Sequence, residues 1–271
     1  MLPTFIVIGA MKCGTTSLYY YLDEHPDIGM SAQKETDFFI SEHGNWRKGM
    51  EWYRSLFPGA PVRGECSPNY TKRHLFGQVP ERIHDICPDV KLIYIVRDPI
   101  KRAISHYVGS CMQGRVSVPF DEAVANPEES NYVLTSCYYQ QLKSYLNVFS
   151  QEQLLVVQNE EMRANPVSAL QRIYHFLEAD PTFVNKRVGT HFNEGVTKKK
   201  RAAWFRWLSS KIPQRWKDSW RLYLPMQWLP GTPVPRPTPS SDTVKELKAI
   251  FRPEVEQLQS LTGQTFSGWE I

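Results

Sequence analysis

Two glycines and a lysine near the start of the chain have a spacing suited to holding phosphate groups. Four residues separate Gly9 from Gly14 in the loop, and Lys12 is one of them. In the pattern G-x-x-x-x-G-K-[ST] the lysine follows the second glycine, a position that Thr15 occupies here. A lysine inside the loop would lie nearer a group being transferred. The loop therefore favours a phosphate-bearing donor over an ordinary Mg-ATP hydrolase. A strand-to-helix turn that binds nothing is the plain alternative.

The elements on either side of this loop would point it at an anion. An apolar, β-branched run at Phe5–Ile8 precedes it, and a helical segment at Ser17–Glu24 follows it. A buried strand, a glycine-bearing loop and a helix in this order direct backbone N–H groups and a helix N-terminus toward one ligand.

A second basic residue follows another apolar run. Lys91–Val96 is continuously apolar after its lysine, which is typical of a central parallel strand, and Arg97 comes next. Open α/β sheets bind ligands at the carboxyl ends of their strands. We therefore predict Arg97 as a second anion contact, with Ser105 two turns into the following helix. An ion pair between Arg97 and Asp98, or another neighbour, is the alternative.

The pattern as a whole predicts an α/β, P-loop-like three-layer fold, with a central, mainly parallel β-sheet flanked by helices. Gln153–Gln158 is a third buried strand. Tyr132–Phe149 predicts a helix whose apolar face includes Tyr138. Thr243–Leu261 predicts a last helix, in which Pro253 is tolerated as a kink or break.

Composition narrows the class of protein. The chain has 271 residues, is 41% hydrophobic and carries a net charge of +4, which fits an anionic ligand without implying nucleic acid. Its five cysteines lack any C-x-x-C pair, so we expect reduced thiols, no zinc and a cytoplasmic protein. The first strand begins almost at Met1, which leaves no room for a signal peptide. No apolar run approaches the roughly 18 residues of a membrane span.

We expect a single domain over residues 1–271, with an aromatic-rich insertion at about 202–230. Five tryptophans lie among basic residues there, and two prolines interrupt the segment. We expect this segment to pack on the protein or to form a lid over the acceptor rather than to contact a membrane surface. The prolines argue against one long interfacial helix.

A charged cluster, Lys34-Glu35-Thr36-Asp37, leads directly into Phe38 and Phe39. One interpretation is a surface turn followed by a buried anchor. The sharper one is that the phenylalanine pair pins the segment while Glu35 faces a cleft.

Three motifs together resemble one family. The loop GAMKCGTTS, the segment IVRDPIKRAISHY and the cluster KETDFF are similar to those of sulfotransferases that use 3′-phosphoadenosine 5′-phosphosulfate (PAPS). The similarity is greatest to the heparan sulfate branch, especially its 3-O-sulfotransferases. The segments GECSPNY, SCYYQQLKSYLNVF, LLVVQNEEMRANP and LTGQTFSGW extend the resemblance over most of the chain.

The resemblance implies a role for particular residues. It implies that Glu35 is the general base and that Lys12 stabilises charge on the transferring sulfuryl group. It implies that the donor is held by Lys12, Cys13, Gly14, Thr15, Thr16 and Ser17 at its 5′-phosphosulfate, by Arg97 and Ser105 at its 3′-phosphate, and by Tyr138 and the loop around Arg236 over the nucleotide. No metal is implied, and the product nucleotide would be 3′-phosphoadenosine 5′-phosphate (PAP).

Departures from the heparan enzymes bear on the acceptor. Cys66 stands where those enzymes carry a lysine, and Asp37 stands where they carry a histidine. Their disulfide-bonded loop is absent and the tryptophan-rich stretch replaces it. We therefore expect a soluble, bacterial-type enzyme acting on the hydroxyl, or the amine, of a carbohydrate or small metabolite.

Other interpretations remain open. A histidine base, as in the steroid- and phenol-sulfating relatives, is an alternative, but His106 and His191 lie on no matching motif. A P-loop nucleotide kinase is disfavoured by the position of the lysine. A non-catalytic nucleotide- or glycan-binding protein would keep the loop without needing Glu35.

Overall fold

The computed structural model of the protein describes residues 1–188, 199–200 and 232–271. Its described strands form a parallel five-stranded sheet in the order β2-β3-β1-β4-β5, and a separate two-stranded antiparallel pair. The strands of the large sheet are β1 (Phe5–Gly9), β2 (Ile28–Met30), β3 (Val62–Cys66), β4 (Lys91–Val96) and β5 (Leu154–Gln158). The pair is β6 (Lys199–Lys200) and β7 (Thr232–Pro233).

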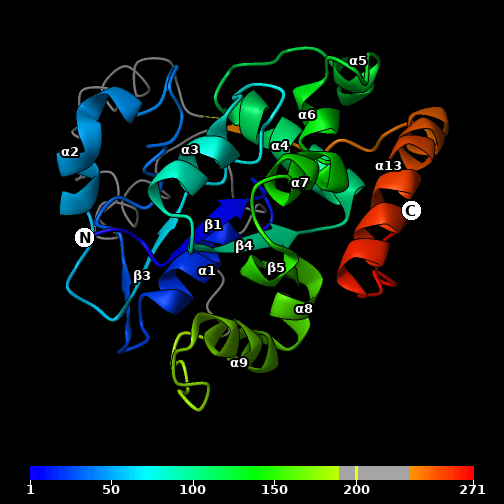
Figure 1. Ribbon diagram of the computed structural model, residues 1–271. Coiled ribbons are helices and arrows are strands. Elements are labelled where there is room, and N and C mark those ends of the chain that lie inside the picture. Colours follow the sequence, from blue (N-terminus) through cyan, green and yellow to red (C-terminus); the bar gives the residue numbers. More distant parts are fainter. Residues whose placement is uncertain (189–198, 201–231) are drawn as a thin grey trace.

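Helices cover both faces of the sheet, so the central strands β1 and β4 are almost entirely apolar rather than alternating. In Figure 1, α1 and α9 lie below the sheet, and α3, α4 and α7 lie above it. The described α-helices are α1 (Thr15–Leu22), α2 (Gly49–Ser55), α3 (Val79–Ile86), α4 (Pro99–Met112), α5 (Phe120–Val124), α6 (Asn131–Leu134), α7 (Tyr138–Leu146), α8 (Asn159–Ala164), α9 (Pro166–Leu177) and α13 (Ser241–Thr262). Short 3-10 helices span Trp46–Lys48 and Gln151–Gln153.

The predicted fold class is confirmed. All five residues of β1 are buried, and β1 lies between β3 and β4 at the centre of the sheet. The three strands predicted from apolar runs correspond to β1, β4 and β5. The carboxyl ends of β1, β3 and β4 therefore meet at one edge, which is where this fold class binds ligands.

One predicted helix is wrong. Tyr132–Phe149 does not form a continuous helix, because the chain leaves the helical path between α6 and α7. Ser136 lies in this break, where its hydroxyl donates to the Pro99 carbonyl and accepts a hydrogen bond from Arg102. These bonds tie the break to α4, a tertiary effect that the helical spacing does not reveal.

The last helix is confirmed and continues through Pro253. The predicted aromatic-rich insertion at about 202–230 and His191 lie outside the described residues. Within the described ranges, no helix combines the length and apolarity needed to cross a membrane.

Candidate active site

The loop between β1 and α1 is shaped by two residues in the left-handed region. Lys12 has a φ of 75° and Gly14 a φ of 98°. This conformation is uncommon for a residue with a side chain, and turns of this kind direct successive N–H groups to one side. A Cβ atom on Gly14 would lie 2.5 Å from Asn159 Nδ2, so only glycine fits there. The free N–H groups of the first turn of α1 add to this potential anion site.

Neighbouring elements hold the loop at Ala10 and Cys13. The Ala10 N–H donates to the Ile95 carbonyl of β4 at 2.7 Å. The Asn159 side chain donates to the Cys13 carbonyl, also at 2.7 Å. Burial raises the pKa of the Cys13 thiol to about 11, so this thiol stays protonated at neutral pH. The loop is therefore preorganised by β4 and α8.

Arg102 of α4 lies beneath the loop and is fully buried. Its guanidinium donates to Ser136 Oγ at 2.6 Å, to the Tyr132 carbonyl, and to the Met11 carbonyl of the loop at 3.4 Å. Within the described ranges, no carboxylate lies close enough to form an ion pair with it. Burial lowers the pKa of Arg102, but a guanidinium stays charged at neutral pH. Its positive charge thus favours an anion in the loop above it.

Arg97 lies where the sequence places it, at the carboxyl end of β4, and is half-buried. The alternative of an ion pair with Asp98 does not hold. The Asp98 carboxylate instead caps α4 by accepting from the Lys101 N–H at 2.9 Å, and it also accepts from the Glu270 N–H at 3.0 Å. In the described parts of the chain, Arg97 forms no ion pair within 4.0 Å. Ser105 is half-buried on α4.

Tyr138 connects Arg97 with the loop from below. Its hydroxyl donates to the Arg97 carbonyl at 2.7 Å and lies 3.6 Å from Cys13 Sγ. The side chain is only 1% exposed. Tyr138 therefore positions the two anion contacts relative to each other, and its contact with a nucleotide stays a prediction.

The Lys12 side chain lies against α4 at Gly109. A Cβ atom on Gly109 would lie 2.7 Å from Lys12 Nζ and 3.0 Å from its Cε atom. The missing side chain at this helical position therefore makes room for the lysine of the loop. Nothing in the sequence motif pointed to Gly109.

The segment with Glu35 is anchored by its two phenylalanines. Phe38 and Phe39 are 1% and 0% exposed, and Phe38 stacks on Tyr53 with ring centroids 4.1 Å apart. The Glu35 side chain is 47% exposed and accepts from Lys34 Nζ at 2.7 Å. Both interpretations of this segment bury the phenylalanine pair, as the structure does, and the cleft that Glu35 would face stays a prediction.

A buried carboxyl group, Glu65, holds this segment from inside the protein. Tyr53 and Ser67 donate to it at 2.6 Å and 2.8 Å, and Thr36 and Tyr70 also donate to it. Burial raises the pKa of Glu65 to about 7, although these hydroxyl groups act in the opposite direction. Thr36 follows Glu35 directly, so Glu65 fixes the backbone next to the predicted base. No sequence motif singled out Glu65, whose only signal was a lone carboxyl group in the segment GECSPNY.

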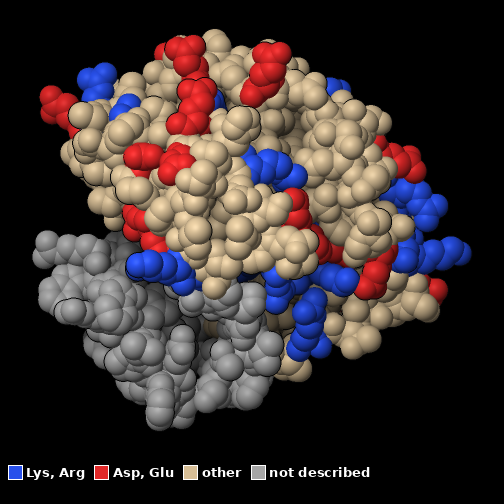
Figure 2. Space-filling view, turned by 90° about the horizontal axis from the view of Figure 1, so that it is seen from below, with Lys and Arg blue, Asp and Glu red and all other residues tan. Residues whose placement is uncertain are grey.

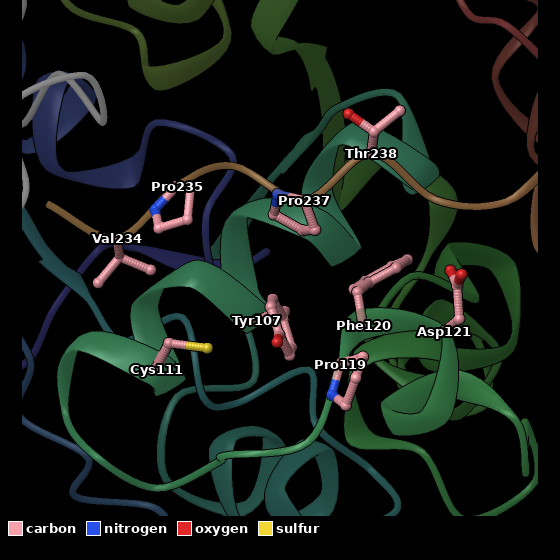
Figure 3. A pocket seen from close by; sticks show the side chains of 9 residues that line it. All are labelled: Tyr107, Cys111, Pro119, Phe120, Asp121, Val234, Pro235, Pro237 and Thr238. Carbon is pink, nitrogen blue, oxygen red and sulfur yellow. The ribbon is translucent and has the colours of Figure 1, made fainter.

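Arg236 lies in the connection between β7 and α13, and its side chain is exposed. Its neighbours Pro235 and Pro237 border a cavity of about 400 Å³. Figure 3 shows them with Tyr107, Cys111 and Phe120 around this cavity. The role of Arg236 stays a prediction.

His106 is not placed as a base. It is 6% exposed, and its Nδ1 atom lies 3.4 Å from the Arg102 guanidinium. Burial, followed by the charge of Arg102, lowers the pKa of His106.

As for metals, no group of three or more potential ligands gathers within the described ranges. On the face shown in Figure 2, Lys and Arg side chains gather near the border with the undescribed residues.

Comparison with known proteins gives a consistent result. The family model for the sulfotransferase domain matches residues 2–228. Heparan sulfate glucosamine 3-O-sulfotransferase 5 is 34% identical in Homo sapiens and 33% in Mus musculus, in each case over 193 residues, which are 66% of this chain and 54% of the relative. The match thus spans about half the length of these relatives.

Among solved structures, a sulfotransferase from Alicyclobacillus acidocaldarius superposes with a TM-score of 0.72 and is 26% identical, with 100% of each chain covered.

Proposed function

Because the chain belongs to the sulfotransferase domain family, we propose that it transfers a sulfuryl group from PAPS to a hydroxyl group of a carbohydrate or small metabolite. The observation that carries this proposal is a pair of separate anion contacts at one sheet edge. Lys12 lies inside the loop that follows β1, and Arg97 follows β4 without an ion-pair partner among the described residues. A donor with phosphate on both sides of its ribose needs two such contacts.

The residues present fit this donor. The loop N–H groups, the first turn of α1 and Lys12 would hold the 5′-phosphosulfate, with the charge of Arg102 beneath them. Arg97 and Ser105 would hold the 3′-phosphate. PAPS supplies the sulfuryl group and, in PAP, a stable leaving group.

Glu35 acts as the general base in this proposal. It accepts the proton of the acceptor hydroxyl while that oxygen forms its bond to sulfur and the bond between sulfur and the phosphate oxygen breaks. Exposure of Glu35 leaves it accessible to an acceptor from solvent. Lys12 neutralises negative charge that develops on the phosphate oxygen, which is an electrostatic contribution to catalysis.

The segment with Glu35 forms the acceptor side of the site, and it carries a second carboxylate. Asp37 is half-buried and accepts from Asn69 Nδ2 at 3.1 Å. Burial raises its pKa. Two carboxylates would repel a densely sulfated chain, and this favours a less anionic acceptor than heparan sulfate. The relatives named above act on heparan sulfate, as their names state, and the carbohydrate class is carried over from them.

Two measurements test the proposal. Thermal unfolding with PAP and with ATP separates it from a nucleotide kinase, because PAP should raise the melting temperature at concentrations at which ATP has little effect. Turnover of PAPS over a panel of hydroxyl and amine acceptors then separates an enzyme from a binding protein. Binding of PAP without turnover of any acceptor would favour the binding protein. The single domain and the cytoplasmic location stay predictions.

A further inference from the structure

Lys72 is a buried lysine beside the phosphate loop that no sequence motif singled out. It lies in the turn after β3, where its N–H donates to the Asn69 carbonyl at 3.0 Å. The residue is only 6% exposed. Its ammonium group reaches the loop and contacts Met11 Sδ at 3.3 Å.

The partners of this ammonium group are too weak for a buried charge. A thioether is a weak acceptor, whereas an ammonium group has three donors to satisfy. Within the described ranges, no carboxylate lies within 4.0 Å of Lys72 Nζ. Burying a charge without a close counter-ion is costly, and such groups are kept mainly at functional sites.

The charges that face Lys72 come from three elements. Arg102 of α4 and Lys12 of the loop oppose its positive charge, and Asp37 and Glu35 of the acceptor-side segment favour it. The nearby His74 and His106 are both shifted toward their neutral forms, in each case mainly by burial. Burial, followed by the charge of Arg102, lowers the pKa of Lys72 to about 8. An anion between Lys12 and Lys72 would relieve this repulsion.

The position of Lys72 also indicates which anionic group it would meet. Its ammonium group touches the loop at Met11, and its N–H donates to Asn69, whose side chain donates to Asp37 in the segment with Glu35. Arg97 instead joins the loop at Cys13 through Tyr138. The loop after β1 forms the donor side of the site. Lys72 therefore lies between the donor side and the acceptor side, where the sulfuryl group must pass during transfer.

We propose that Lys72 is a second cationic contact of the sulfuryl group, which it shares with Lys12. This inference rests on the proposed function. The buried Cys66 thiol cannot provide such a charge, because burial raises its pKa to about 12. Lys72 would bind the intact donor more than the product PAP, since PAP has lost the sulfuryl group.

The test compares Lys72→Met and Lys72→Arg with the control Lys143→Met, which removes an exposed lysine. Binding of PAPS and of PAP is measured by calorimetry without acceptor. We expect Lys72→Met to weaken PAPS binding about ten- to hundredfold, as for loss of a charged hydrogen bond, and PAP binding by less than about threefold. Lys72→Arg should recover part of the loss. Lys143→Met should match wild type.

The pH dependence gives a second readout. In wild type, kcat/KM for PAPS should fall above pH 8 as Lys72 loses its proton, and Lys72→Met should lack this limb. Melting temperatures check folding, and methionine should not destabilise a site from which it removes a buried charge. Equal weakening of PAPS and PAP, or unchanged binding of both by Lys72→Met, would overturn the role of Lys72. Failure of the wild-type protein to bind either nucleotide would instead overturn the proposed function.

Discussion

The donor side and the acceptor side of the site are held in different ways. The loop after β1 is fixed by strand and helix neighbours at Ala10, Met11 and Cys13. The segment with Glu35 has an exposed base, and its inward anchors are Phe38, Phe39 and the bond from Thr36 to Glu65. The difference suggests that one rigid loop serves a constant donor, whereas the base is carried by a segment that can vary with the acceptor.

Removing the charge of Arg102 beneath the loop should have the largest effect on donor binding. Arg102→Met deletes both the buried charge and the bond to the Met11 carbonyl. We expect PAP affinity to fall about a hundredfold, which corresponds to the roughly 3 kcal/mol of a hydrogen bond to a charged group. Calorimetry with PAP measures this, with the exposed Arg252→Met as control. Wild-type PAP affinity in Arg102→Met would contradict the claim that the charge of Arg102 supports donor binding.

Removing the anchor of the acceptor side should change stability and not donor binding. The folded protein keeps a proton on Glu65 up to a pH of about 7, whereas the unfolded chain loses it near 4.5. The unfolded state thus binds fewer protons in this range, and the free energy of unfolding falls as pH rises from about 4.5 to about 7. This contribution is on the order of 3 kcal/mol.

Glu65→Gln should therefore flatten this part of the stability profile, as urea unfolding at several pH values would measure. Its PAP affinity should stay within about twofold of wild type, because Glu65 touches no donor-side residue in its hydrogen bonds. The exposed Glu256→Gln is the control and should keep the slope. An unchanged slope in Glu65→Gln would show that the carboxyl group is not the buried, protonated anchor described here.

The smallest effect is expected at Gly109. A substitution there should lower turnover without lowering stability. Alanine there would press on Lys12 Nζ, the mobile end of a side chain, and would favour the α4 helix by about 1 kcal/mol. We expect kcat to fall about tenfold, or about 1.4 kcal/mol in the barrier, with an equal or higher melting temperature. Gly59→Ala, which meets nothing within 4 Å, is the control. Full activity in Gly109→Ala would mean that the position of Lys12 against α4 has no bearing on turnover.

Local sequence pattern was sufficient to predict the donor-binding loop and Arg97. It was insufficient to predict the buried residues that surround the site. The apolar runs predicted β1, β4 and β5, and the motif residues Lys12 and Arg97 follow two of these strands. Arg102, Glu65 and Lys72 were missed because their roles depend on burial and on contacts with residues far away in the sequence, such as the bond from Arg102 to Met11. The break between α6 and α7 was missed for the same reason, since Ser136 bonds to α4.

Glu35→Gln tests the central claim most directly, namely that a base on the acceptor side works on a donor held independently of it. The measurement pairs transfer of labelled sulfuryl from PAPS to an acceptor with PAP affinity of the same preparation. We predict that transfer falls at least a hundredfold, in the range of general-base catalysis, while PAP affinity stays within about twofold of wild type. Transfer at the wild-type rate, or loss of PAP binding together with transfer, would contradict the account.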